Sequence, residues 1–222
     1  MAFDPGVLRV QLEDGLSQLR IDVTLTQVRQ LMDFLALLGK WNQVYNLTSI
    51  RDPRDMLVVH VLDALSILPL VDAHARETVL DVGSGAGLPG IPLAIMRPLS
   101  MWSVDAVAKK ISFQVQVKSA LALSNLNPVH ARIEAVNIDR PVSLIVSRAF
   151  SEIAKMLVAV DRLAGAGATV IAMKGVVPTA ELAAIPDGWQ VRDVVALEVP
   201  FLGAERCAVI LQRASPTVSV LP

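Results

Sequence analysis

The residues of this chain best suited to chemistry begin with a carboxylate that stands directly before a glycine-rich segment. Asp81 lies in the apolar run 78–82, and four glycines follow it before the next apolar run. Such glycines let the backbone approach a ligand closely, and a helix after them points free N–H groups into the same space. The segment therefore predicts a nucleotide-type ligand site. A turn with only a packing role is the weaker interpretation, because one tight turn does not require four glycines. The four are Gly83, Gly85, Gly87 and Gly90.

Asp81 also separates the two classes of cofactor that use such a turn. Residues 85–90 satisfy the G-x-G-x-x-G pattern of dinucleotide folds, so the pattern alone leaves both classes open. A pyrophosphate against these glycines would lie close to Asp81, and like charges about 5 Å apart repel by roughly 3 kcal/mol at an effective dielectric near 20. S-adenosylmethionine carries no phosphate and has an ammonium and a sulfonium, which a carboxylate attracts. We therefore predict S-adenosylmethionine at this turn, with an NAD-dependent oxidoreductase as the rival.

A second carboxylate supports an adenosine site. Asp105 follows the apolar run 101–104 and lies 20 residues beyond Gly85. In doubly wound sheets an acidic side chain at the end of the second strand accepts hydrogen bonds from ribose hydroxyls. Both cofactor classes predict this residue, so it does not choose between them. Taken alone, it would be read as a solvated loop aspartate.

The elements that must position these residues follow from the hydrophobic pattern. After Thr24 and Thr26, either of which can cap a helix, apolar residues recur at three- and four-residue spacing, and Asp52 with Pro53 begins a second helix. From residue 78 onward, short apolar runs alternate with helical ones, which indicates a parallel sheet covered on both faces. The expected strands are 78–82, 101–104, 129–131, 144–147, 168–173, 190–197 and 208–212, and the helices among them are 89–95, 109–123, 152–163 and 179–185.

This order predicts an α/β fold of the class I methyltransferase, Rossmann-like type, with a mostly parallel seven-stranded sheet, an antiparallel last strand and an N-terminal helical extension. The last two runs are joined by a short connection around 200–203, so they should form an antiparallel hairpin. Such an ending is typical of adenosylmethionine-dependent methyltransferases and foreign to a standard dinucleotide domain. We expect residues 1–75 to form the extension and 76–222 the core, as one structural unit.

Length and composition restrict the domain organisation, the location and the binding partners of the protein. Its 222 residues suit one domain with an appended segment, and the apolar run 56–71 is interrupted by His60, Asp63 and Pro69, so we expect a soluble protein without a membrane span. Cys207 is the only cysteine, which favours the reducing cytoplasm. The net charge of −1 means that any nucleic-acid partner must be bound by a local basic patch.

The residues after the fourth strand restrict the methyl acceptor. Carbon methylation of a pyrimidine needs a cysteine nucleophile, but Cys207 falls in the last strand as a small hydrophobe. Exocyclic amines usually require an Asn- or Asp-Pro-Pro-aromatic turn, whereas this chain has Ser-Arg-Ala-Phe at 147–150. Arg148 suits a phosphate, a carbonyl or a guanine edge, and guanine N7 needs no general base. That Arg148 simply pairs with a carboxylate such as Glu152 remains open.

Other polar residues are weaker candidates. His60 lies among aliphatic residues and is expected to be a hydrogen-bonded structural histidine, and no His, Cys and Asp cluster has metal-ligand spacing. Asn46, His60 and Lys174 could reach the acceptor side of the cleft, although satisfying core polar groups explains each nearly as well.

Several sequence blocks together resemble the bacterial 16S ribosomal RNA guanine-N7 methyltransferase family, also called glucose-inhibited division protein B. The resemblance covers roughly 39–213 and implies methyl transfer from S-adenosylmethionine to N7 of one guanosine in the decoding region of small-subunit ribosomal RNA. It implies cofactor contacts at Gly83, Leu88, Ile133, Glu134 and Arg148. Ala106 and Ala108 depart from the family pattern of serine and glycine. The blocks are 40–42, 46–49, 51–53, His60 with Asp63, 81–92, 97–98, 147–150 and 174–175.

Two alternative functions are compatible with the same predicted cofactor residues. One is a methyltransferase of a small nucleophilic metabolite, and the other is a noncatalytic RNA-binding module with the same fold. Because the chain has little positive charge, we expect the RNA target to be the small ribosomal subunit or an assembly intermediate.

Overall fold

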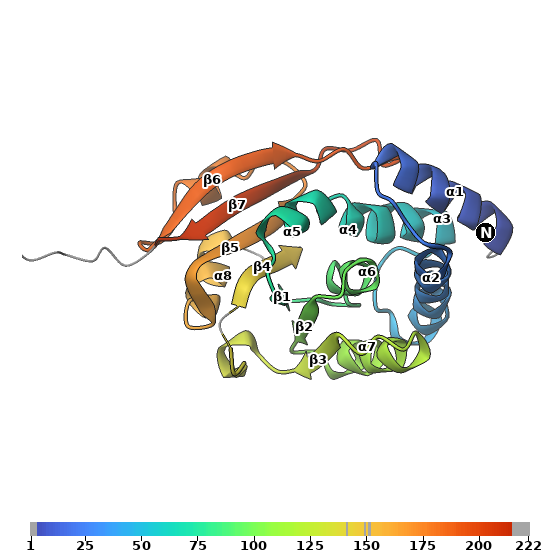
Figure 1. The fold of residues 1–222 in the computed structure, drawn as a ribbon, viewed down its shortest axis with the longest axis horizontal. Coiled ribbons are helices and arrows are strands. Elements are labelled where there is room, and N and C mark those ends of the chain that lie inside the picture. The colour runs from blue at the N-terminus through green and yellow to red at the C-terminus, as the bar shows by residue number, and fades with distance from the viewer. Residues whose placement is uncertain (1–3, 141, 149, 151, 215–222) are drawn as a thin grey trace, which may run out of the picture.

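The molecule is built on one mixed sheet with helices on both faces (Figure 1). The computed structural model describes residues 4–140, 142–148, 150 and 152–214. The strand order is β3-β2-β1-β4-β5-β7-β6, with parallel pairing from β3 through β5 and with β7 antiparallel to both of its neighbours. The fold class predicted from the sequence is therefore confirmed, including the final hairpin. The strands are β1 Thr78–Val82, β2 Ser100–Asp105, β3 Leu126–His130, β4 Val142–Arg148, β5 Ala164–Lys174, β6 Trp189–Ala196 and β7 Cys207–Arg213.

The order of the strands fixes where a ligand can bind. From β1 the chain continues outward to β2 and β3 on one side, and it then returns to β4 and β5 on the other side. At such a switch point the loops at the carboxyl ends of the two central strands diverge and leave a crevice. The glycine turn after β1 and the Arg148 segment at the end of β4 both lie at this point.

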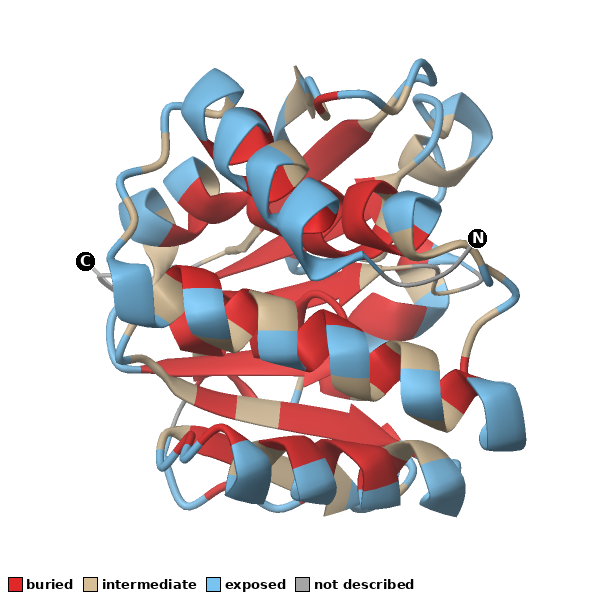
Figure 2. Cartoon of the chain, turned by 90° about the vertical axis from the view of Figure 1, so that its right-hand side faces the viewer, coloured by how far each residue is buried: buried red, intermediate tan, exposed pale blue. Residues whose placement is uncertain are grey.

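The helices divide the core into two layers, one on each face of the sheet. One apolar cluster packs the N-terminal helices, α6 and α7 on one face, and the other packs α8 on the opposite face. Figure 2 shows buried residues along the strands and the inner sides of the helices, with exposed residues outside. The helices are α1 Pro5–Gln18, α2 Leu25–Tyr45, α3 Pro53–Met56, η1 Leu57–Leu62, α4 Asp63–Leu65, α5 Leu68–His74, α6 Gly90–Met96, α7 Ala108–Ala120, η2 Ile133–Ala135, α8 Ile153–Val160 and α9 Thr179–Leu182.

Helix α2 joins the N-terminal segment to the core. Of the two possible caps, Thr24 is the one used, and it forms a capping box with Gln27. The Gln27 amide also donates to the carbonyls of Ile95 and Met96 at the end of α6, and Gln30 donates to the Leu121 carbonyl after α7. Helix ends leave carbonyls without intrahelical partners, so α2 satisfies groups that the core helices cannot satisfy themselves.

The second predicted helix contains an unexpected π-helical turn. Asp52 and Pro53 begin it as predicted, but Leu57–Leu62 form η1, a π-helix. Such turns are rare and occur frequently at functional sites. By length and composition Pro53–His74 could cross a membrane, but 72% of its most apolar window is buried inside the fold. That burial is typical of a core helix.

Some expected element boundaries are wrong. β3 begins at Leu126, earlier than 129, because Pro128, which lacks an N–H donor, is tolerated on an edge strand. β5 begins at Ala164, where an Ala-Gly-Ala-Gly sequence gives no β-strand signal. Helix α8 ends at Val160 and α9 at Leu182, both earlier than expected.

Two helical glycines give a matched test of how tightly α1 packs. A Cβ at Gly15 would lie 2.6 Å from Leu62 Cδ1, whereas a Cβ at Gly39 meets no atom within 4 Å. Gly39→Ala should raise the free energy of unfolding by about 1 kcal/mol through helix propensity. Gly15→Ala should lower it by up to about 2 kcal/mol, because overpacking costs more than propensity gains. Urea titration would measure both, and equal stabilisation by the two variants would refute close packing of α1 on η1.

Candidate functional site

The glycine turn encloses a fully buried carboxylate. Asp81 Oδ2 accepts a hydrogen bond from the backbone N–H of Gly90 at 2.8 Å, and Oδ1 finds no partner in the described part of the chain. Burial raises the pKa of Asp81 to about 7 from its ordinary 3.8. A Cβ at Gly90 would lie 2.6 Å from Asp81 Oδ2, so glycine is required there for the carboxylate to fit. The turn thus holds an acid whose charged form lacks a cationic contact.

Asp105 fastens the same turn from the second strand. Its Oδ2 accepts from the N–H of Gly85 and its Oδ1 from the N–H of Val107, both at 2.8 Å. Gly83, Gly85 and Gly87 all have positive φ, which explains the concentration of glycine. Each carboxylate oxygen can accept more than one hydrogen bond, so Asp105 retains capacity toward a ligand.

A cavity of about 250 Å³ opens over the ends of β1 and β2; we call it the first cavity. Four predicted cofactor residues, Gly83, Asp105, Ile133 and Glu134, come together in its lining, together with Phe150. Asp81, Gly85, Gly87 and Leu88 do not line it: they form the buried turn beneath, and Leu88 packs in the core. The remaining lining residues are Val82, Val104, Ala106, Ala131 and Arg132.

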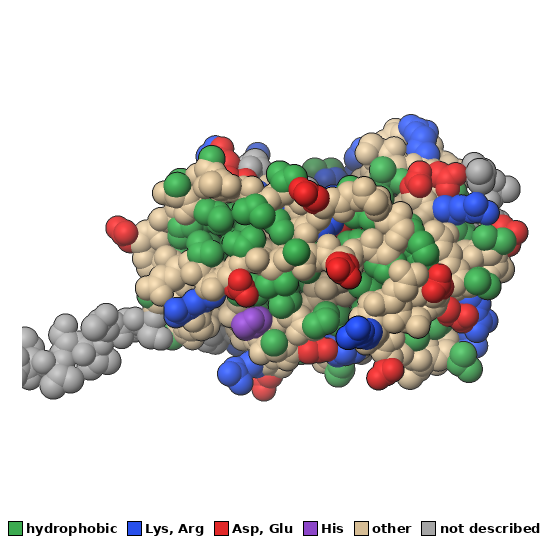
Figure 3. Space-filling model, turned by 90° about the horizontal axis from the view of Figure 1, so that it is seen from above, with side chains coloured by type: hydrophobic (Ala, Val, Ile, Leu, Met, Phe, Trp, Pro, Cys, Tyr) green, Lys and Arg blue, Asp and Glu red, His purple; other side chains and the backbone are tan. Residues whose placement is uncertain are grey.

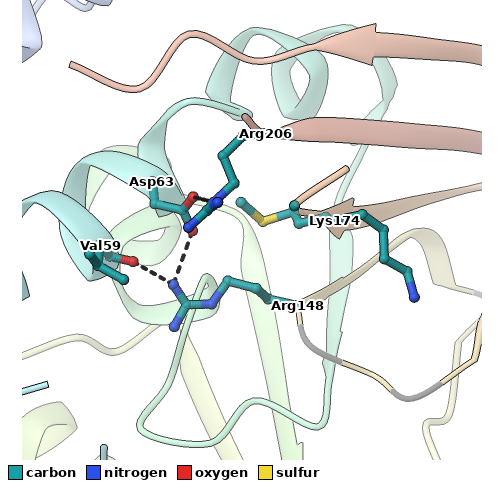
Figure 4. Close-up of a pocket in the computed structure, with 7 residues that line it drawn as sticks. Val59, Asp63, Arg148, Lys174 and Arg206 are labelled. Atoms are coloured by element: carbon teal, nitrogen blue, oxygen red, sulfur yellow. Dashed lines mark hydrogen bonds and ion pairs between the residues drawn. The ribbon is translucent and has the colours of Figure 1, made fainter. Parts of the chain in front are cut away.

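A second cavity, of about 370 Å³, lies on the other side of the switch point (Figure 4). It is bounded by η1 and α4, the ends of β4 and β5, and the residue before β7. Its lining residues are Val59, Asp63, Arg148, Met173, Lys174, Gly175 and Arg206. We call it the acceptor-side cavity, since Arg148 was predicted to face the methyl acceptor.

A buried ion cluster forms one wall of the acceptor-side cavity. Asp63, whose side chain is 3% exposed, accepts from Arg148 Nη1 on one oxygen and from Arg206 Nε on the other, both at 3.0 Å. Arg148 Nη1 also donates to the Val59 carbonyl at 2.7 Å, in the π-helical turn. Figure 4 shows the three charged side chains pointing toward one another from separate elements.

The alternative left open for Arg148, that it pairs with a carboxylate, is confirmed, but the carboxylate is not Glu152. Its carboxylate partner is Asp63, and Glu152 pairs instead with Lys155 at 2.6 Å on the surface. Arg148 is therefore held by an ion pair and still lines the acceptor-side cavity. Within the same block, Ala149 lies outside the described residues.

His60 connects this cluster to the loop after α2. One ring nitrogen lies 2.9 Å from Thr48 Oγ1, and the other lies 3.4 Å from Arg148 Nη2. Burial, and secondarily the charge of Arg148, lower the pKa of His60 to about 4. His60 is thus neutral near pH 7 and hydrogen-bonded, as expected for a structural histidine.

The other two predicted acceptor-side residues differ in position. Asn46 is the left-handed C-cap of α2 and accepts from Arg51 Nη2 at 3.2 Å; it lines neither cavity. Lys174 lines the acceptor-side cavity, but its ammonium lies 2.9 Å from both carboxylate oxygens of Glu181. In Figure 4 its side chain points away from Asp63.

Two residues of the site were not assigned a role from the sequence. Asp63 carries a usable signal, because it stands three residues after His60 in an otherwise apolar helix and so shares one helix face with it. Arg206 carries none: it lies in the connection before β7, far along the chain from its partner.

Comparisons with known proteins assign most of the chain to one family. The family model GidB, described as rRNA small subunit methyltransferase G, matches residues 27–210. "Ribosomal RNA small subunit methyltransferase G" from Burkholderia ambifaria is 47% identical over 212 residues, covering 92% of each chain. The protein of the same name from Azoarcus sp. strain BH72 is 47% identical over 205 residues, covering 91% of this chain and 95% of its own.

Solved structures share the fold at low identity. A SAM-dependent methyltransferase from Aquifex aeolicus has a TM-score of 0.58 at 22% identity, covering 76% of this chain and 97% of its own. The N-methyltransferase NodS from Bradyrhizobium japonicum, in complex with S-adenosylhomocysteine, has a TM-score of 0.57 at 13% identity, covering 79% and 98%.

The environment of His60 predicts how the free energy of unfolding depends on pH. The folded protein keeps the ring neutral down to about pH 4, whereas the unfolded chain takes up the proton near pH 6.5. Protonation therefore favours the unfolded chain, and the free energy of unfolding falls as the pH falls below about 6.5. Relative to His60→Gln, the wild type should lose about 2 kcal/mol of unfolding free energy between pH 7.5 and 5. Denaturant titrations of both proteins at each pH would measure this, and parallel pH profiles would contradict it.

Proposed function

Because the chain belongs to the rRNA small subunit methyltransferase G family, we propose that it transfers the methyl group of S-adenosylmethionine to N7 of one guanosine in the decoding region of 16S ribosomal RNA. Family and fold together make the protein an S-adenosylmethionine-dependent methyltransferase. The observation that carries the finer proposal is the pair of cavities on either side of the switch point, one beside an unpaired buried acid and the other beside two arginines.

The first cavity and the turn beneath it fit the cofactor. Asp81, in that turn, has no ion pair with any residue that the structure describes, and the cofactor's ammonium would supply a positive charge that stabilises its ionised form. We assign Asp105 to the ribose hydroxyls and the Ile133–Glu134 pair to the adenine. Gly83 lines the cavity, and a side chain there would approach Phe150. Gly85, Gly87 and Leu88 shape the turn beneath it.

The acceptor chemistry fits the second cavity. The bound cofactor supplies an electrophilic methyl group on a sulfonium. Guanine N7 presents a free lone pair, so the N–CH₃ bond forms as the S–CH₃ bond breaks, and no proton has to be removed. The residues must therefore orient the base and exclude water. Arg148, held by Asp63 at the end of β4, would serve this orientation. His60 is not needed as a base, which agrees with its use as a partner of Thr48.

The N-terminal helices contribute directly to this site. Val59 and Asp63 come from the predicted extension 1–75, while the other lining residues come from the core 76–222. We propose that the two parts act as one structural unit in RNA binding. Asn46, at the loop before this segment, would act at the rim if it acts on RNA at all.

Charge indicates what kind of RNA target the enzyme uses. Acidic and basic side chains are interspersed over the face seen in Figure 3, and the net charge is −1. Free RNA binds mainly through phosphate neutralisation, which this surface supports poorly. We propose that the target is the cytoplasmic small ribosomal subunit or an assembly intermediate, whose shape contributes to recognition.

The decisive experiment is to map the product. Purified protein and labelled S-adenosylmethionine are incubated with small subunits from cells that lack the enzyme, and the RNA is digested for mass spectrometry. We expect one 7-methylguanosine in 16S ribosomal RNA, and a lower rate with Asp81→Asn. Label found only in small molecules would support the metabolite-methyltransferase alternative and remove this proposal.

Binding of the cofactor product should be linked to protons through Asp81. Its pKa of about 7 leaves about half of the carboxyl groups protonated at pH 7, and a bound ammonium favours the ionised form. S-adenosylhomocysteine should therefore release about half a proton on binding at pH 7, and its affinity should rise up to about tenfold from pH 6 to 8.

Calorimetry in buffers of different ionisation enthalpy measures this proton release. Asp81→Asn keeps the size of the side chain and should remove the linkage. An unchanged pH dependence in this variant would show that another group is responsible.

A further inference from the structure

The ion cluster of the acceptor-side cavity leaves one positive charge uncompensated. A single carboxylate, Asp63, meets two guanidinium groups, and each of its oxygens accepts from a different one. The fourth charged lining residue, Lys174, is already paired with Glu181. The wall around Asp63 therefore carries a net charge of +1 and attracts an electronegative ligand atom.

The two arginines differ in what they can still donate. Both terminal nitrogens of Arg148 are engaged: Nη1 with Val59 and Asp63, and Nη2 with His60. Arg206 uses Nε toward Asp63 and Nη1 toward the Glu205 carbonyl. Its Nη2 makes no hydrogen bond to any residue that the structure describes, and its side chain is 25% exposed. Arg206 is therefore the better placed of the two to bind a ligand.

The rest of the lining suits a flat ring. Val59 and Met173 supply apolar surface beside the arginines, and the volume of about 370 Å³ is in the range of small-ligand pockets. A guanine offers one strong acceptor next to N7, the carbonyl oxygen O6, and arginine is its commonest partner. N7 itself must stay free to be methylated. Adenine carries an amino group in place of O6, and this donor cannot accept a hydrogen bond from a guanidinium.

We propose that Arg206 determines the specificity of methyl transfer by donating a hydrogen bond from its free Nη2 to O6 of the target guanine, and that Asp63 is the positioning residue that orients it. This inference rests on the proposed function. Contact of Arg206 with a phosphate is the competing use of the same charge, and it would weaken all RNA substrates equally.

A cycle that removes each partner in turn tests the hydrogen bond. Small subunits are reconstituted with RNA that carries either guanosine or 2-aminopurine riboside at the methylated position; the latter lacks O6 but keeps N7. Wild-type kcat/KM should fall about tenfold to a hundredfold from guanosine to 2-aminopurine, and Arg206→Ala should show a similar loss on guanosine. The kcat/KM of Arg206→Ala should then be little lower on 2-aminopurine than on guanosine, because the variant has already lost the hydrogen bond to O6.

Arg213 provides the matched control. It ends β7, the strand that begins directly after Arg206, and its guanidinium pairs with Asp161 at 2.9 Å in a more exposed setting. Arg213→Ala should leave both rates within about twofold of wild type. Asp63→Asn should reduce the ratio of the two kcat/KM values, as Arg206→Ala does. The affinity of Arg206→Ala for S-adenosylhomocysteine should equal that of the wild type.

The possible outcomes separate this inference from the proposed function. If the wild type does not methylate guanosine at all, the proposed function fails. If the wild type is active but Arg206→Ala lowers both rates by the same factor, Arg206 contacts phosphate or only stabilises the fold, and the O6 hydrogen bond is refuted. A loss confined to the substrate with O6 supports it.

Discussion

The buried carboxylate of Asp63 is the constraint on which the acceptor side of this protein depends. Taking charges out of water costs several kcal/mol per ion, and the cost is offset only when the geometry satisfies them. Asp63 meets this condition through Arg148 at the end of β4 and Arg206 in the connection directly before β7. One side chain thus fixes the relative positions of α4, the end of β4 and the connection that leads into β7. Loss of either arginine would leave a buried charge only partly compensated, so the three elements are energetically coupled.

Two buried acids at the same edge of the sheet have opposite surroundings. Asp81 accepts one backbone N–H and forms no ion pair with any residue in the described part of the chain, and burial raises its pKa to about 7, whereas Asp63 pairs with two guanidinium groups. In the proposed function, the cofactor's ammonium would complete the first environment and an electron-rich atom of the base would complete the second. The division follows the switch point, because the residues after β1 and β2 form one environment and those after β4 and β5 form the other. The two cavities therefore differ in electrostatics as well as in position.

What could be predicted from the sequence was encoded locally. The Thr24 cap, the start at Asp52 and Pro53, the glycine turn and the alternating strands all depend on residues a few positions apart. The unpredicted features depend on distant pairs. Arg148 lies 85 residues from Asp63 in the chain, and Arg206 lies 143 residues from it. No periodicity or spacing records such contacts, so the sequence placed Arg148 at the right strand end but could not name its partner. The π-helical turn also takes part in such a distant contact, since its Val59 carbonyl accepts a hydrogen bond from Arg148.

The N-terminal helices complete the acceptor-side cavity of a widely shared fold. The first cavity is lined by core residues alone, and structures of other methyltransferases share this fold at 22% identity or less. The acceptor-side cavity is incomplete without Val59 and Asp63, which come from the segment before β1. That segment is held against α1 and α2, and α2 in turn is fixed by Gln27 and Gln30 at the ends of α6 and α7. The geometry of the acceptor side therefore depends on side-chain contacts more than one helix away. Substitutions that loosen α2 should then disturb the arginines while leaving the cofactor turn intact, because the described partners of Asp81 and Asp105 all come from the core: the backbone N–H groups of the turn and of Val107, and the Lys110 ammonium 3.6 Å from Asp105.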